Sequence, residues 1–179
     1  MIETLVERAR VFALKAHEGI VRPNKAQEPY STHIKEVAEL VEQSGGSQDE
    51  IAAAWLHDTI EDTKTTLDDI QREFGETVAT IVDGLTDKPD LQGMPTFARK
   101  QLQAERVRTK NDSVKQVKIA DQTSNVRSVA IDPPVTWDKQ KCLDYVNGAL
   151  VIVEECKTVS PFLYSEFVKA HKEAVAAHS

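Results

Sequence analysis

One segment, residues 51–62 (IAAAWLHDTIED), most strongly constrains how this chain can fold. It begins with isoleucine, three alanines, tryptophan and leucine, which favour a helix buried on all sides. It then becomes polar: His57 and Asp58 are adjacent, and two acids follow one turn later. On a continuous helix at about 100° per residue, Glu61 and Asp62 share with this pair an arc of about 140°. One imidazole and three carboxylates would repel one another here without a positive charge, so the segment predicts a divalent metal site.

The rest of the chain predicts an all-α fold. Glycines are few, 7 in all, and apolar residues recur every three or four positions, as on one face of a helix. Gly75 and the pair Pro133 and Pro134 interrupt such stretches and predict helix ends. The irregular segment 88–96 contains two prolines and a glycine, and we expect it to form a mobile flap. Neither a repeat nor a linker divides the sequence, so we expect a single-domain helical bundle over residues 1–179.

Charge and composition limit the classes of partner. The formal net charge of −7 argues against a nucleic-acid binder, which needs a basic face for phosphate backbones. No apolar run reaches membrane-spanning length, and the first residues carry no charged-then-apolar export signal. Cys142 and Cys156 are the only cysteines, and on one continuous helix they would lie about 21 Å apart, too far for a disulfide. We therefore expect a cytoplasmic protein with reduced thiols that binds neither nucleic acid nor membrane.

Four residues are candidate metal ligands: His33, His57, Asp58 and Asp121. Two imidazoles and two carboxylates suit manganese, iron or zinc, and on a six-coordinate ion they leave two positions for water and a substrate oxygen. Spacing alone does not bring His33 or Asp121 to the other two. His33, in a first helical turn, could instead be a polar cap or a core residue. Asp121 could point outward and pair with a lysine, although an inward aspartate on its apolar helix would need a partner.

Other polar residues are candidates for catalysis or binding. Glu61 and Asp62 lie one turn beyond the candidate ligands and could orient a water or transfer its proton, although the same acids could form an exposed turn. Basic residues could contact phosphate or could be ordinary solvated charges. They are Arg22, Lys25, Arg99, Lys100, Lys118 and Lys141.

Three pieces of the sequence, in this order, carry a resemblance to a known family. They are residues 28–33 (EPYSTH), 54–63 (AWLHDTIEDT) and 118–125 (KIADQTSN). Together they resemble the HD-domain metal-dependent phosphohydrolases, in particular the hydrolase domain of the RelA/SpoT proteins and, most closely, the small stand-alone Mesh1-like alarmone hydrolases. The resemblance extends from about Val6 to Cys156, and the string Leu-His-Asp-Thr-x-Glu-Asp-Thr is its most specific part.

The resemblance implies an all-α HD-domain fold, one metal ion, usually Mn²⁺, and hydrolysis of the 3′-diphosphate of guanosine tetra- and pentaphosphate. The products would be GDP or GTP and pyrophosphate. It also implies roles for individual residues. The ligands would be His33, His57, Asp58 and Asp121, the catalytic acids Glu61 and Asp62, and the substrate contacts Arg22, Lys25, Lys100, Asn125, Lys141 and Tyr145.

The sequence departs from the family pattern in places that bear on base recognition. The loop 21–25 reads Val-Arg-Pro-Asn-Lys where the family often has Arg-Lys-x-Gly, so Arg22 matches and Lys25 is displaced. Residues 122–124 (Gln-Thr-Ser) replace a stretch that is commonly basic and aromatic. Two other functions therefore stay open: a phosphatase for another nucleotide, such as NADPH or a nucleoside monophosphate, and a non-catalytic nucleotide-binding module. The expected partner is a small-molecule nucleotide, Zn²⁺ or Fe²⁺ could replace Mn²⁺, and a homodimer is one open oligomeric state.

Overall fold

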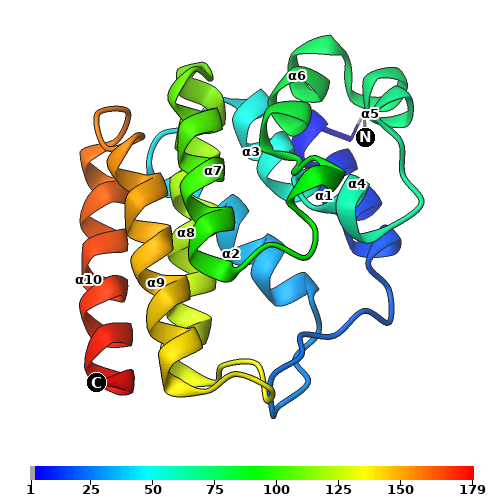
Figure 1. Ribbon diagram of the computed structural model, residues 1–179. Helices are drawn as coiled ribbons and strands as arrows, with labels where there is room; N and C mark the ends of the chain where they lie inside the picture. Colours follow the sequence, from blue (N-terminus) through cyan, green and yellow to red (C-terminus); the bar gives the residue numbers. More distant parts are fainter. Residues whose placement is uncertain (1–2) are drawn as a thin grey trace.

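The computed structural model describes residues 3–179, and its regular elements within that range are all helical. The described residues form ten α-helices and one short 3₁₀-helix, and Figure 1 shows how the α-helices are arranged. They are α1 (Leu5–Ala16), α2 (Ser31–Gln43), α3 (Gln48–Leu56), α4 (Thr59–Asp62), α5 (Leu67–Phe74), α6 (Glu76–Leu85), η1 (Pro89–Leu91), α7 (Thr96–Arg108), α8 (Asp112–Ile131), α9 (Lys139–Glu154) and α10 (Pro161–His178). The predicted all-α class is confirmed.

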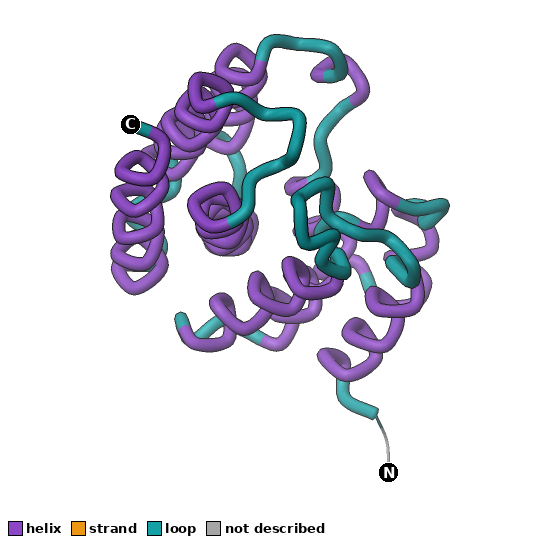
Figure 2. Tube along the Cα trace, turned by 90° about the horizontal axis from the view of Figure 1, so that it is seen from below, coloured by secondary structure: helices purple, strands orange, loops and turns teal. Residues whose placement is uncertain are grey.

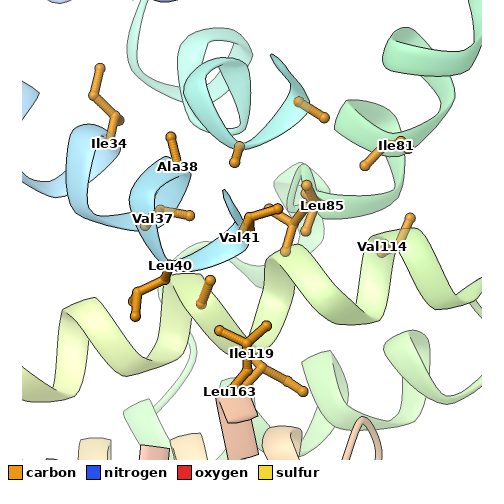
Figure 3. Close-up of a cluster of buried hydrophobic side chains, with 14 of the residues drawn as sticks. Ile34, Val37, Ala38, Leu40, Val41, Ile81, Leu85, Val114, Ile119 and Leu163 are labelled. Atoms are coloured by element: carbon orange, nitrogen blue, oxygen red, sulfur yellow. The ribbon is translucent and has the colours of Figure 1, made fainter. Parts of the chain in front are cut away.

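The longest helix, α8, organises the bundle. It contacts α9 and α10 on one side and α2, α3 and α6 on the other (Figure 1). Figure 3 shows aliphatic side chains of α2, α6 and α8 meeting in the core, with Leu163 of α10 beneath Ile119. Several polar residues of α8 are buried as well, including Lys118, Asp121 and Ser124. Buried polar groups need hydrogen-bond or charged partners, so these side chains have to interact with other polar groups inside the bundle.

Short-range signals set many of the helix ends. Ser47 and Thr66 each form a capping box at the start of α3 and α5. Gly75 ends α5 with a φ of 89°, a left-handed backbone that glycine adopts without strain. Among the described residues, no helix is long and apolar enough to cross a membrane.

The predicted continuous helix over 51–62 is wrong, because the structure divides it into α3 and α4. His57 and Asp58 form the turn between them. The His57 ring nitrogen Nδ1 lies 2.7 Å from the Ala54 carbonyl oxygen, and the Thr59 hydroxyl donates to the Leu56 carbonyl at 2.6 Å. Side chains thus satisfy carbonyls at the end of α3 that backbone amides would satisfy in a longer helix.

Two irregular segments frame the face where α2, the α3–α4 turn and α8 meet. The loop before α2 is joined to the loop after α8, because the Val135 amide donates to the Pro23 carbonyl at 3.0 Å. Asp132 also accepts hydrogen bonds from the backbone amides of Lys25 and Ala26. Figure 2, seen from below, shows these loops side by side.

The predicted flap 88–96 is partly ordered, since it contains η1 and buries Leu91. Its mobility stays a prediction.

Candidate metal centre

The four predicted ligands converge although they come from three separate parts of the chain. Hereafter we call His33, His57, Asp58 and Asp121 the ligand cluster. His33 Nε2 lies 3.2 Å from His57 Nε2, and 3.4 Å from both Asp58 Oδ2 and Asp121 Oδ1. His57 Nε2 lies 3.0 Å from the same Asp58 oxygen and 3.6 Å from the same Asp121 oxygen. Ligand atoms of His33, His57 and Asp58 therefore lie within 4.8 Å of one another, and Asp121 Oδ1 lies next to both imidazoles.

The distances among His33, His57 and Asp58, and those from Asp121 to the two imidazoles, fit one divalent ion. Ligand atoms about 2.1 Å from a common ion lie about 3.0 Å apart at a right angle and about 3.4 Å apart at a tetrahedral angle. Because the Ala54 carbonyl only accepts, the His57 proton bonded to it lies on Nδ1, and Nε2 would present a lone pair to an ion that displaces the second ring proton. Lone pairs and carboxylate oxygens that face one another at these distances are stabilised by a cation.

The electrostatics of the cluster favour charge separation despite burial. Burial opposes ionisation, yet the Asp58 carboxylate raises the pKa of His57 well above its usual value. The pKa of Asp58 is lowered mainly by His57, and the pKa of Asp121 mainly by Lys118, in both cases against the effect of burial. Both aspartates are therefore anionic, as metal ligands have to be.

Hydrogen bonds from neighbouring side chains orient both carboxylates. Tyr30 donates its hydroxyl to Asp58 Oδ2 at 2.6 Å, and burial raises the Tyr30 pKa, so this hydroxyl stays protonated. Asn125 Nδ2 donates to Asp121 Oδ1 at 2.8 Å, and Gln122 Nε2 donates to Asp121 Oδ2 at 2.8 Å. Sequence reasoning did not single out Tyr30; its only signal was its place within the string 28–33. The hydrogen bonds from Tyr30, Asn125 and Gln122 fix the direction of the lone pairs on the two carboxylates.

The two predicted catalytic acids lie next to the ligand cluster in the sequence and line a cavity. This cavity, of about 510 Å³, is lined by Glu61 and Asp62 together with Lys88 and Arg99. Glu61 is exposed as a residue, but its carboxylate is held against the backbone and accepts the Asp87 amide at 2.6 Å. Desolvation at that position and the nearby Asp58 charge raise the pKa of Glu61 to about 7. A carboxyl group with such a pKa can both accept and donate a proton near neutrality.

Asp62 has a partner that the sequence did not reveal. The buried His17 ring places Nε2 3.5 Å from Asp62 Oδ2 and stacks on Tyr30, with ring centroids 5.4 Å apart. Its other nitrogen, Nδ1, lies 3.0 Å from the Ala13 carbonyl. His17 lies just beyond the end of α1, and no local pattern marks such a residue as part of a distant site.

Four of the predicted substrate-binding residues are linked to the ligand cluster. Arg22 donates to Asn125 Oδ1 at 3.0 Å, and Asn125 in turn bonds to Asp121. Lys100 donates to Gln122 Oε1 at 2.7 Å, and its ammonium nitrogen lies 4.0 Å from the centroid of the Tyr145 ring. These groups form the polar wall on one side of the centre.

The other two predicted contacts lie further out. Lys25 is exposed, and its backbone amide, not its side chain, donates a hydrogen bond to Asp132. Lys141 is also exposed and sits over Trp137, 5.3 Å from the ring centroid. Sequence reasoning missed Trp137, which packs 5.0 Å from Tyr145 and helps line a second cavity of about 160 Å³ together with Arg22. An aromatic wall of this kind suits a planar ring.

Comparisons with known proteins bear on fold and function together. A family profile described as "HD domain" matches residues 9–143. The guanosine-3′,5′-bis(diphosphate) 3′-pyrophosphohydrolase MESH1 of Xenopus tropicalis is 34% identical over 161 residues, covering 89% of this chain and 88% of the relative. The human protein of the same name is 34% identical over 145 residues, covering 80% of this chain and 79% of the relative. A solved structure, described as a metazoan ortholog of SpoT that hydrolyses ppGpp, superposes with a TM-score of 0.88 at 23% identity, covering 96% of both chains.

Proposed function

Because this chain belongs to the HD-domain family, we propose that it is a metal-dependent hydrolase that removes the 3′-diphosphate of guanosine tetra- or pentaphosphate as pyrophosphate. The observation that carries the proposal is that His33, His57 and Asp58 bring ligand atoms within 4.8 Å of one another, with Asp121 Oδ1 3.4 and 3.6 Å from the two imidazoles. The MESH1 relatives of Xenopus tropicalis and human, named for this reaction, align with 89% and 80% of the chain. The chain thus has the donor set for a metal and is similar to relatives that are named as hydrolases.

The donors of the ligand cluster fit a single divalent ion, and we infer Mn²⁺, with Zn²⁺ or Fe²⁺ as the alternatives. When bound, such an ion supplies Lewis acidity and neutralises charge on phosphate oxygens. Tyr30, Asn125 and Gln122 keep the two carboxylates turned inward. These hydrogen bonds would help to hold the carboxylates in position for the ion.

Proton transfer falls to the two acids beside the cluster. A water oxygen bonds to the phosphorus that is attached to the 3′ oxygen, and the water loses a proton. The bond between this phosphorus and the 3′ oxygen breaks, and the 3′ oxygen gains a proton. In this proposal Glu61 and Asp62 take a proton from the water and return one to the leaving oxygen. The raised pKa of Glu61, about 7, suits either step.

Binding of the nucleotide falls to the polar and aromatic groups around the centre. A substrate with several phosphates needs positive charge, and the Lys100 ammonium and the Arg22 guanidinium lie on the side of the cluster marked by Gln122 and Asn125. The proposed contacts are Arg22, Lys25, Lys100, Asn125, Lys141 and Tyr145. We place the enzyme in the cytoplasm, an assignment supported by the two buried, unpaired cysteines.

The direct test supplies the purified protein with Mn²⁺ and guanosine tetraphosphate. We expect GDP and pyrophosphate in equal amounts, measured by ion-exchange chromatography and a coupled pyrophosphate assay. Release of orthophosphate alone would contradict the proposal. A panel that contains NADPH and nucleoside monophosphates, compared by kcat/KM, tests the choice of substrate.

The Asp58→Ala variant tests the role of the ligand cluster. Removal of this carboxylate takes away one ligand and leaves the two histidines with only one of their two shared anionic neighbours, so we expect loss of Mn²⁺ binding and of turnover together. Isothermal titration calorimetry and the pyrophosphate assay measure the two effects. Asp68→Ala, an exposed aspartate on α5, is the matched control and should leave both unchanged. Full activity in Asp58→Ala would show that the centre lies elsewhere.

A further inference from the structure

A chain of hydrogen bonds runs outward from the side of His33 that faces away from the other ligands. His33 Nδ1 lies 2.9 Å from the Ser124 hydroxyl oxygen, and that hydroxyl lies 2.6 Å from Glu36 Oε2. Glu36 Oε1 accepts a hydrogen bond of 2.8 Å from Arg127, and Arg127 also donates to Glu166 of α10 at 2.7 Å. The chain therefore connects the centre to the C-terminal helix through α2 and α8.

The direction of these bonds follows from the donors that each group has. Glu36 is paired with the Arg127 guanidinium, and an ionised carboxylate only accepts. The single hydroxyl proton of Ser124 is therefore donated to Glu36. Ser124 then has only lone pairs to offer His33, so the His33 proton lies on Nδ1 and the lone pair on Nε2. That is the tautomer in which Nε2 can bind an ion together with His57, Asp58 and Asp121.

The hydroxyl of Ser124 is unusual among its neighbours. A serine or threonine inside a helix commonly donates to the carbonyl one turn earlier, and the adjacent Thr123 does so, to Ile119 at 2.7 Å. Ser124 donates across to another helix instead, although it is 1% exposed and follows Thr123 directly. The acceptor on α2, Glu36, is thus what turns this hydroxyl toward the ligand.

We propose that Ser124 and Glu36 are positioning residues that hold His33 in its metal-binding tautomer and ring orientation. The proposal deepens, and rests on, the metal-dependent hydrolase function proposed above. Through Arg127 and Glu166 the same chain of bonds makes α10 a support for the centre, although α10 lies beyond residues 9–143, the region that the HD-domain profile matches.

Two variants remove the chain of bonds at different points. Ser124→Ala deletes the acceptor of the His33 proton, and Glu36→Met deletes the group that orients the Ser124 hydroxyl. Loss of such a partner typically weakens metal binding by about 10- to 100-fold. We expect about 10-fold for each variant, because a cavity of about 330 Å³ beside His33 lets water replace part of the bond. The Mn²⁺ affinity is measured by electron paramagnetic resonance of the free ion.

Two further variants are controls. Glu36→Gln keeps a carbonyl oxygen that can accept from Ser124, so its Mn²⁺ affinity should stay within about twofold of the unaltered protein. Thr123→Val removes a buried hydroxyl of the same helix that bonds only to the backbone, so it should lower Tm without weakening Mn²⁺ binding. For Ser124→Ala and Glu36→Met, kcat at saturating Mn²⁺ should return to near its original value.

The tautomer itself is measured without metal or substrate. Long-range ¹H–¹⁵N correlation spectra of the metal-free protein should show His33 protonated at Nδ1, with this preference lost in Ser124→Ala. Unchanged Mn²⁺ affinity in both Ser124→Ala and Glu36→Met, or an unchanged tautomer in Ser124→Ala, would overturn the proposal. Failure of the unaltered protein to hydrolyse guanosine tetraphosphate would instead contradict the proposed function and leave the spectroscopic result to decide the role of Ser124.

Discussion

Among single residues, Lys100 shows most plainly how a group can serve binding at the expense of stability. Its side chain is 3% exposed, with the Gln122 oxygen and the Tyr145 ring as partners. Burial lowers its pKa to about 7, because a desolvated ammonium lacks the hydration of the unfolded state. A phosphate group that arrived beside it would provide the negative charge that the fold provides only at a distance.

Lys100→Met should therefore impair binding more than folding. Methionine fills similar space without a charge, so we expect KM for the nucleotide to rise about 10-fold, the size expected for a lost charged hydrogen bond. Tm at pH 7 should be higher, because the buried charge is removed. Lys110→Met, an exposed lysine just beyond α7, is the control and should alter neither value. An unchanged KM in Lys100→Met would remove Lys100 from the proposed substrate contacts.

The pH dependence of stability provides a separate check on the Lys100 environment. An unfolded lysine keeps its proton up to about pH 10.4, whereas folded Lys100 loses it near pH 7. The unfolded state therefore binds more protons between these values, and stability from this group rises as the pH increases from 7 to 10. The Tm difference between Lys100→Met and the unaltered protein should shrink over that range, as measured by calorimetry at pH 7 and pH 9.5. A constant difference would indicate an ordinary lysine pKa.

Among the elements, α7 and α9 show how packing places a functional side chain. Gly148 of α9 lies against Lys100 of α7, and a Cβ at Gly148 would come 2.6 Å from the Lys100 Cβ. No side chain fits there without moving one helix or the lysine. The close approach of the two helices is thus part of what buries Lys100.

Gly148→Ala should cost about 1–3 kcal/mol through overpacking and lower Tm by about 2–12 °C. It should also raise KM several-fold, because the added methyl displaces Lys100. Gly84→Ala is a matched control, since its Cβ would meet Val114 Cγ2 at the same distance, 2.6 Å, and has no Lys100 atom among its three nearest neighbours. Both variants should lose stability, measured by thermal unfolding, but only Gly148→Ala should change KM. Equal KM values in the two would show that Lys100 keeps its position.

At the scale of the whole molecule, the ligand cluster joins α2, the α3–α4 turn and α8 at one point. Three separate parts of the chain have to be folded before the four donors meet. An ion that binds the cluster and not the unfolded chain therefore adds its binding free energy to the stability of the entire bundle.

Manganese should accordingly raise Tm. At a free Mn²⁺ concentration of 100 times Kd the added stability is about 2.7 kcal/mol, which corresponds to about 5–11 °C for a chain of this size. Differential scanning fluorimetry with Mn²⁺, and again after EDTA, measures the shift. Asp58→Ala should show none. An equal shift in that variant would place the stabilising ion outside the cluster.

Local signals in the sequence were sufficient for the helical class, for several helix ends and for the chemistry of the centre. Gly75 ends α5 because its backbone is left-handed, and Pro161 begins α10 because its ring suits the first turn of a helix. The adjacent pair His57 and Asp58, placed after an apolar helix, indicated a metal because such groups need a counter-charge. Each of these inferences depends on residues that are close together in the chain.

Tertiary packing decided which distant groups meet. His33 and Asp121 had alternative interpretations in the sequence, and only the contact of α2 and α8 brings both to His57. The break after α3 depends on hydrogen bonds from side chains, so helical periodicity did not reveal it. The bond between Ser124 and Glu36 likewise joins two helices. Periodicity records which residues share a face of one helix, whereas the partner of that face is set by how the whole bundle excludes water.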